Sequence, residues 1–146
     1  MAEPHVYDKA KYHYGGEYPD DLPEEQAFIH TGMFLGWMLD HDLYDRDFWQ
    51  DVAGYIASFK AREMTGAQVS EHACDGVLMD EMLNAEGNAF AQSYFDFERG
   101  KYLQDYDELL VGDLPSTYHV EDTWDNYGVI SKRISDRYAE WKRKEA

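Results

Sequence analysis

Apolar residues recur at helical spacing along most of the chain beyond residue 20. Between Asp21 and about Asp42 they occupy every third or fourth position and also fall on other sides of a helix. A helix that is apolar over so much of its circumference is normally covered by other helices. An acidic N-cap residue, a proline in the first turn and a capping-box glutamate mark its start. The pattern predicts a central helix over this range.

Gly32 and Gly36 lie one turn apart in this predicted central helix. Glycine costs roughly 1 kcal/mol in a helix interior relative to alanine. Close approach of a neighbouring helix is the natural compensation, so the pair predicts tight helix packing at this point.

Further segments show the same helical period. Predicted helices run from Phe48 to about Glu63, from the Thr65 capping box to about Asp75, from about Asp80 to Phe97, over residues 101–110 and from about Asp122 to Lys144. The basic last turn of the final helix suits the negative end of the helix dipole.

The first twenty residues lack a helical period and contain a Gly15-Gly16 pair among tyrosines. We therefore expect residues 1–20 to form an extended arm that lies on a helical body of residues 21–144. No segment shows convincing strand-like alternation. The predicted fold is all-α: a single compact domain of about five to six helices with an extended N-terminal arm.

Composition is that of a folded protein with an aromatic-rich core. Of the 146 residues, 44% are hydrophobic and 16% are aromatic. The first eleven residues lack the apolar region of a signal peptide, and no apolar run is long enough to span a membrane. Cys74 is the single cysteine, so an internal disulfide is excluded. These features predict a soluble protein of a reducing cytoplasm.

The net charge of the chain restricts the classes of partner that can be expected. Thirty acidic residues against 13 lysines and arginines give a formal net charge of −17. Such a surface repels phosphate backbones and anionic lipid, so neither nucleic acid nor a membrane is expected as a partner. The charge is uneven: residues 71–126 hold 14 acidic and 2 basic side chains, whereas residues 127–146 hold 3 acidic and 6 basic ones.

The residues that commonly carry catalysis do not form a recognisable motif. The histidines are His5, His13, His30, His41, His72 and His119, and none stands in an HExxH or HxxxH arrangement. The serines lack a nucleophile elbow, and no glycine-rich phosphate loop is followed by lysine. We therefore predict no enzyme activity, no metal and no cofactor, although a metal-dependent hydrolase with residues assembled by folding stays an alternative.

The strongest candidate for a binding site is a run of acidic residues after residue 100. It comprises Asp105, Asp107, Glu108, Asp113, Glu121, Asp122 and Asp125, interleaved with Tyr102, Tyr106, Tyr118, Trp124 and Tyr127. Tyrosine and tryptophan anchor protein interfaces, and carboxylates speed association with a basic partner. The alternatives are a solvated acidic surface and, for several of the aromatic residues, a place in the core.

Several short motifs resemble those of an uncharacterised family of small acidic bacterial proteins. They are Tyr12–Gly16, Asp21–Glu25, Thr31–Trp37, Asn84–Phe90 and Tyr118–Trp124. The likeness spans nearly the whole chain. Members of this family have no assigned enzyme activity and look similar to the immunity proteins that accompany polymorphic toxins.

This resemblance implies a cytoplasmic inhibitor of a cognate toxin and supplies no active-site residues. An acidic immunity protein would be steered to a basic toxin and would occlude its active or substrate-binding surface. An interaction module without a toxin partner is the other alternative. The oligomeric state stays open.

Overall fold

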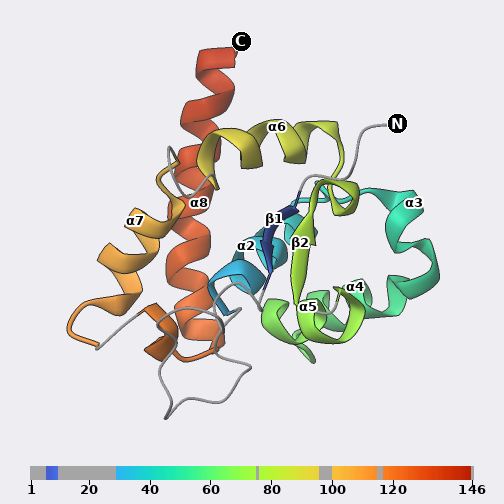
Figure 1. Cartoon of the computed structure of the whole chain (residues 1–146), viewed down its shortest axis with the longest axis horizontal. Helices are drawn as coiled ribbons and strands as arrows, with labels where there is room; N and C mark the ends of the chain where they lie inside the picture. The colour runs from blue at the N-terminus through green and yellow to red at the C-terminus, as the bar shows by residue number, and fades with distance from the viewer. Residues whose placement is uncertain (1–5, 10–28, 75, 96–99, 115–116, 146) are drawn as a thin grey trace.

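Helices account for most of the described residues, in agreement with the predicted all-α fold (Figure 1). The computed structural model describes residues 6–9, 29–74, 76–95, 100–114 and 117–145. The helices are α2 (Ile29–Asp40), α3 (Arg46–Trp49), α4 (Ala53–Lys60), α5 (Gly66–Cys74), α6 (Ala85–Tyr94), α7 (Tyr102–Tyr106) and α8 (Trp124–Glu145). If α3 and α4 are taken as one interrupted helix, the described residues contain six helical segments, as expected.

Helix α2 is the centre of the core. Every residue from Ile29 to Leu39 is buried, and α2 packs against α4, α5 and α8. Leu35, for example, is 1% exposed. The prediction of a central helix is therefore confirmed, and its end at Asp40 lies close to the expected one. The predicted start at Asp21 lies outside the described residues.

The close packing predicted at Gly32 and Gly36 is also confirmed. A Cβ atom at Gly32 would collide with the backbone of Ala67 on α5, and one at Gly66 would collide with the carbonyl oxygen of Gly32. At Gly36, a Cβ would lie 2.8 Å from the ring of Phe59 on α4. Gly32 and Gly66 allow the backbones of α2 and α5 to approach, and Gly36 leaves room for the Phe59 ring, which offsets the cost of glycine within the helices.

The next two predicted helices occupy the expected ranges. The first is interrupted by a 3-10 turn at Gln50–Val52, which separates α3 from α4. The second, α5, begins with the predicted capping box. The Thr65 backbone N–H donates to Gln68 Oε1 at 2.9 Å, and the Gln68 N–H donates to Thr65 Oγ1 at 3.2 Å.

The region before α6 differs from the prediction. Instead of one helix from Asp80, the chain forms strand β2 (Val77–Met79), a 3-10 turn at Asp80–Met82 and then α6, which is capped by Asn84. Strand β2 pairs antiparallel with β1 (Val6–Lys9), so that Val6 faces Met79 and Lys9 faces Val77. A three-residue strand is too short to show alternation, and its partner lies about seventy residues away in sequence. The rest of the predicted arm lies outside the described residues.

Helices α7 and α8 lie together on the left of the molecule, and α6 crosses its top toward α8 (Figure 1). Helix α7 continues as a π-helical segment, Asp107–Val111, and packs on α8, which also contacts α2 and α6. The indole N–H of Trp37 on α2 donates to Ser135 Oγ on α8 at 3.0 Å. Within the described ranges, no helix is both long enough and apolar enough to cross a membrane.

Candidate functional site

Asp105 does not lie on the surface with the other acidic residues of its segment. Its side chain is 0% exposed. Arg133 Nη1 donates to it at 2.9 Å, Arg137 donates through Nε at 2.9 Å and Nη2 at 3.0 Å, and the Tyr94 hydroxyl donates at 2.7 Å. The expectation that Asp105 faces a partner is therefore wrong. The residue instead joins α7 to α6 and α8.

The electrostatics of Asp105 follow from these contacts. Burial alone would raise the pKa of its carboxyl group, but the hydrogen bonds from Arg137, Tyr94 and Arg133 outweigh burial and lower it. The same contact raises the pKa of both guanidinium groups. The cluster is a fully paired buried carboxylate, which has a structural role.

Asp122 is the second of the predicted acidic site residues that is not fully exposed. Its side chain is half-buried, and it accepts a hydrogen bond from the Thr65 hydroxyl at the start of α5. Burial raises its pKa, and the hydrogen bond from Thr65 only partly offsets this effect. Asp122 therefore connects the segment that precedes α8 to the start of α5. Its half-buried carboxylate is poorly placed to contact a partner.

The remaining predicted acidic residues are exposed, and we call them the acidic segment. They are Asp107, Glu108, Asp113, Glu121 and Asp125. Glu108 lies 3.7 Å from Arg133, and its side chain is more than half exposed. Within the described residues, the other four carboxylates form no ion pair.

The aromatic residues predicted as interface anchors are mostly core residues. Tyr102 and Tyr106 are 0% exposed and Tyr127 is 7% exposed, so these three cannot contact a partner. Tyr118 and Trp124 are partly exposed. These tyrosines lie on the apolar sides of their helices, and those sides face the core.

Sequence reasoning missed two apolar residues in this region. Leu114 and Val129 are 43% and 45% exposed and are the exposed large hydrophobic residues of the described structure. Leu114 follows Asp113 directly, and Val129 lies one helical turn after Asp125 on the same side of α8. Val129 could have been found from the sequence, because it falls outside the apolar stripe of α8.

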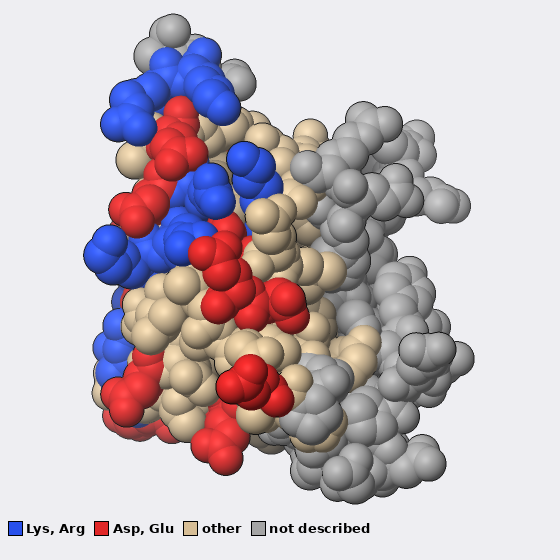
Figure 2. Space-filling view, turned by 90° about the vertical axis from the view of Figure 1, so that its left-hand side faces the viewer, with Lys and Arg blue, Asp and Glu red and all other residues tan. Residues whose placement is uncertain are grey.

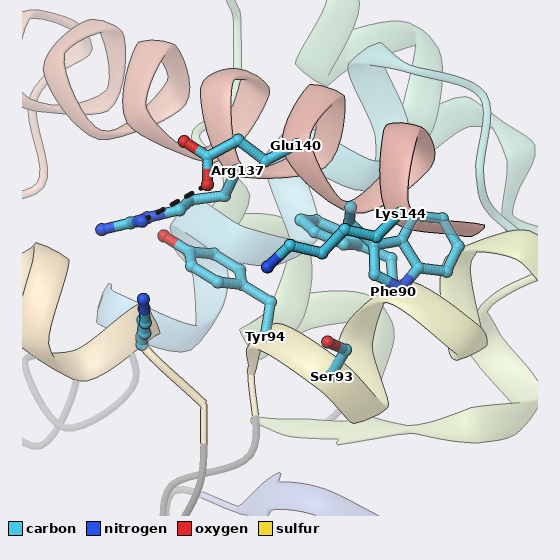
Figure 3. A pocket seen from close by; sticks show the side chains of 8 residues that line it. Phe90, Ser93, Tyr94, Arg137, Glu140 and Lys144 are labelled. Carbon is cyan, nitrogen blue, oxygen red and sulfur yellow. Dashed lines mark ion pairs between the residues drawn. The ribbon is translucent and has the colours of Figure 1, made fainter. Parts of the chain in front are cut away.

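A recess of about 140 Å³ lies between α6, the residue before α7 and the last turns of α8. Its basic residues are Lys101, Arg137 and Lys144, and we call it the basic recess. Figure 3 shows Lys144 extending from α8 toward Tyr94 on α6, with Arg137 beside Glu140. Arg137 is committed to Asp105 and lies 3.6 Å from Glu140.

The two regions occupy opposite ends of the α7–α8 pair. Lysine and arginine side chains gather at the upper end of this side, toward the C-terminal end of α8, and acidic side chains gather lower down (Figure 2). The favourable positions in the helix dipole contribute to this division, because Asp125 lies in the first turn of α8 and Lys142, Arg143 and Lys144 lie in its last turn.

Histidine, cysteine, aspartate and glutamate are the side chains that most often ligate metal ions in proteins. In the part of the chain that the structure describes, no three of them lie together in an arrangement that could hold an ion. His30 is buried beside Tyr106 and Tyr118, and His41 stacks on Trp37. His5 and His13 lie outside the described residues.

Comparisons with known proteins place the chain in a family but give no function. Searches of curated proteins and of solved structures found no significant match. A family described as a domain of unknown function (DUF7832) matches residues 6–120, which include Asp105 and most of the acidic segment. Helix α8, which supplies Arg137 and Lys144, lies after the matched span. The chain therefore belongs to this family of uncharacterised domains, DUF7832.

Proposed function

We propose that the chain is a binding protein that recognises a basic protein through its acidic segment. In its specific form, the proposal is that the partner is a cognate bacterial toxin, whose active or substrate-binding surface the chain occludes. The observation that carries the proposal is that unpaired exposed carboxylates and the exposed apolar residues Leu114 and Val129 occur in the same part of the chain.

These two kinds of residue would contribute differently to binding. Asp107, Asp113 and Asp125 have no internal ion pair to break within the described structure, so they can meet a basic partner at little structural cost. Leu114 and Val129 would lose water on contact and would lengthen the lifetime of the complex. Charge would therefore set the association rate, and the apolar pair would set the dissociation rate.

The toxin-specific form rests on two further arguments. The short motifs resemble those of proteins that look similar to immunity proteins of polymorphic toxin systems. A net charge of −17 would also attract a basic toxin over distances of about 8 Å at physiological ionic strength and about 30 Å at 0.01 M salt. Toxins that attack nucleic acid are commonly basic, which makes them suitable partners.

The experiment uses the product of the neighbouring gene as the candidate partner, provided that it is a large secreted protein with a variable C-terminal domain. Association of that domain with the parent chain would be followed against ionic strength, alongside survival of cells that express the toxin. The test variant replaces Asp107, Asp113 and Asp125 with lysine. We expect slower association, a weaker dependence on salt and loss of protection.

A matched control changes the net charge by the same amount elsewhere. Glu63, Glu71 and Glu81 are exposed and lie on other parts of the surface, so the control replaces these three with lysine. If both triple variants slow association equally, only the total charge matters and the acidic segment is not the interface. If neither variant loses protection, the proposal fails. If the partner binds in the same way but is not toxic, the proposed binding function holds and the proposed immunity function fails.

A further inference from the structure

The basic recess contains positive charge that the fold itself does not use. Arg137 is neutralised by Asp105 and Glu140, but Lys101 and Lys144 form no ion pair with any residue in the described ranges. Both lysines are exposed at the recess. In a chain with 30 acidic and 13 basic residues, two unpaired lysines lining one recess call for an explanation beyond composition.

The helix dipole explains only one of these lysines. Lys144 lies in the last turn of α8, where a cation is favourable. Lys101 directly precedes the first turn of α7, where a cation meets the positive end of the helix and is unfavourable. An anion held between the two ammonium groups would relieve this local repulsion.

The walls of the recess indicate what such an anion would carry. The ring of Trp141 is partly exposed and lines the recess together with the buried ring of Phe90. The exposed Ser93 on α6 offers a hydroxyl group that can donate a hydrogen bond (Figure 3). A volume of about 140 Å³ exceeds that of a single bound water and has room for a small anionic group.

We propose that the basic recess binds a phosphate monoester. The two negative charges of the phosphate match the two unpaired ammonium groups of Lys101 and Lys144, and lysine is well suited to phosphate as a point charge. Ser93 donates a hydrogen bond to a phosphate oxygen, and the organic part of the ester lies against Trp141. This site lies away from the acidic segment, so the inference goes beyond the proposed partner binding and does not depend on it.

The test is a titration of the isotope-labelled full chain with phenyl phosphate, followed by NMR at about 0.15 M salt, where long-range repulsion by the acidic surface is screened beyond about 8 Å. We expect saturable shifts in the signals of residues around Ser93, Lys101 and Trp141, and a nuclear Overhauser contact between the phenyl protons and the Trp141 indole. No shift at the recess with millimolar phenyl phosphate would overturn the proposal.

A double variant tests the two lysines directly. Lys101→Gln with Lys144→Gln should weaken binding roughly tenfold or more, because two charge-assisted contacts are lost. Lys60→Gln with Lys132→Gln is the matched control, since both are exposed lysines that pair with an aspartate, Asp42 and Asp136, and do not line the recess. Equal weakening in the control, or undiminished binding in the double variant, would contradict the proposal.

Further probes separate the possible sources of the ester. Inorganic phosphate should bind more weakly than phenyl phosphate, because it leaves Trp141 uncovered. Benzoate, with one negative charge, should bind more weakly than both. A phosphotyrosine peptide that binds more tightly than phenyl phosphate would identify a phosphorylated side chain as the source, whereas equal or weaker binding would identify a free small molecule. Equal affinity for benzoate and phenyl phosphate would overturn the assignment to phosphate.

Discussion

The acidic segment and the basic recess lie at opposite ends of the same pair of helices, and they differ in more than the sign of their charge. Within the described ranges, Asp107, Asp113 and Asp125 at the acidic end are exposed and form no ion pair, and the same holds for Lys101 and Lys144 at the basic end. Between them, charges of both signs pair completely around the buried Asp105.

This difference shows that the charge total does not reveal which groups are available for binding. Asp105 and Asp107 are two residues apart, but only Asp105 faces α8. A carboxylate held by two arginines and a tyrosine is part of the fold, whereas an unpaired exposed one can meet a partner. The paired cluster also positions Arg137 on one wall of the basic recess.

The largest expected effect comes from breaking the paired cluster. Asp105→Asn should lower the free energy of unfolding by about 3 kcal/mol, near the low end of the range for a broken buried ion pair because both arginines keep partial contact with water. Asp107→Asn should change it by less than about 0.5 kcal/mol. Urea denaturation of both variants measures the contrast. Equal midpoints would mean that Asp105 is not a structural residue.

Acid should change the stability contributions of the buried Asp105 and the half-buried Asp122 in opposite directions. The folded-state pKa of Asp105 is lowered, so its stabilisation is present above the unfolded-state pKa of about 3.9 and is lost as the pH falls through the folded-state value. The folded-state pKa of Asp122 is raised, so its contribution is present below the unfolded-state value and is lost as the pH rises through the folded-state one.

Denaturation midpoints between about pH 7 and pH 1 test this pair, because the Asp105 contribution is lost only below about pH 3.9. Relative to the parent, stability should fall less steeply with acid in Asp105→Asn and more steeply in Asp122→Asn. A change of the same sign in both variants would contradict the assignment.

A smaller effect is expected at the exposed contact between α6 and α8. Glu86 accepts hydrogen bonds from the Tyr138 hydroxyl and, at 3.0 Å, from Lys142 Nζ. Since the Glu86 and Lys142 side chains are 39% and 51% exposed, Glu86→Gln should cost about 0–1 kcal/mol. Thermal unfolding of Glu86→Gln and of Asp105→Asn compares the loss of an exposed ion pair with the loss of a buried one. A loss as large as that of Asp105→Asn would show that exposure is a poor guide here.

The smallest expected effect is that of replacing the two recess lysines on stability and on association at the acidic segment. Lys101→Gln with Lys144→Gln should leave the free energy of unfolding within about 0.5 kcal/mol of the parent, because neither lysine forms an ion pair with another residue that the structure describes. Association with a basic partner should stay the same or become slightly faster, since the net charge becomes more negative. Slower association would show that the two ends belong to one binding surface.

Local patterns predicted the helices well and the irregular parts poorly. The apolar circumference of α2, the Thr65–Gln68 capping box and the stripe of α8 depend on residues within a few turns of one another, so the sequence contains the whole signal. The β1–β2 pair and the 3-10 turn before α6 were missed, because pairing between Val6 and Met79 depends on how distant segments pack.

The same division applies to the candidate site. Sequence by itself determined that the chain is helical, that negative charge is concentrated between residues 71 and 126, and that the C-terminal helix is basic. Only the tertiary structure decided that Asp105 is buried, that Leu114 and Val129 are exposed, and that Lys101 and Lys144 share one recess. The physical reason is that helical period fixes which side of a helix a residue occupies, whereas packing of one helix on another decides whether that side meets water, a counter-charge or a cavity.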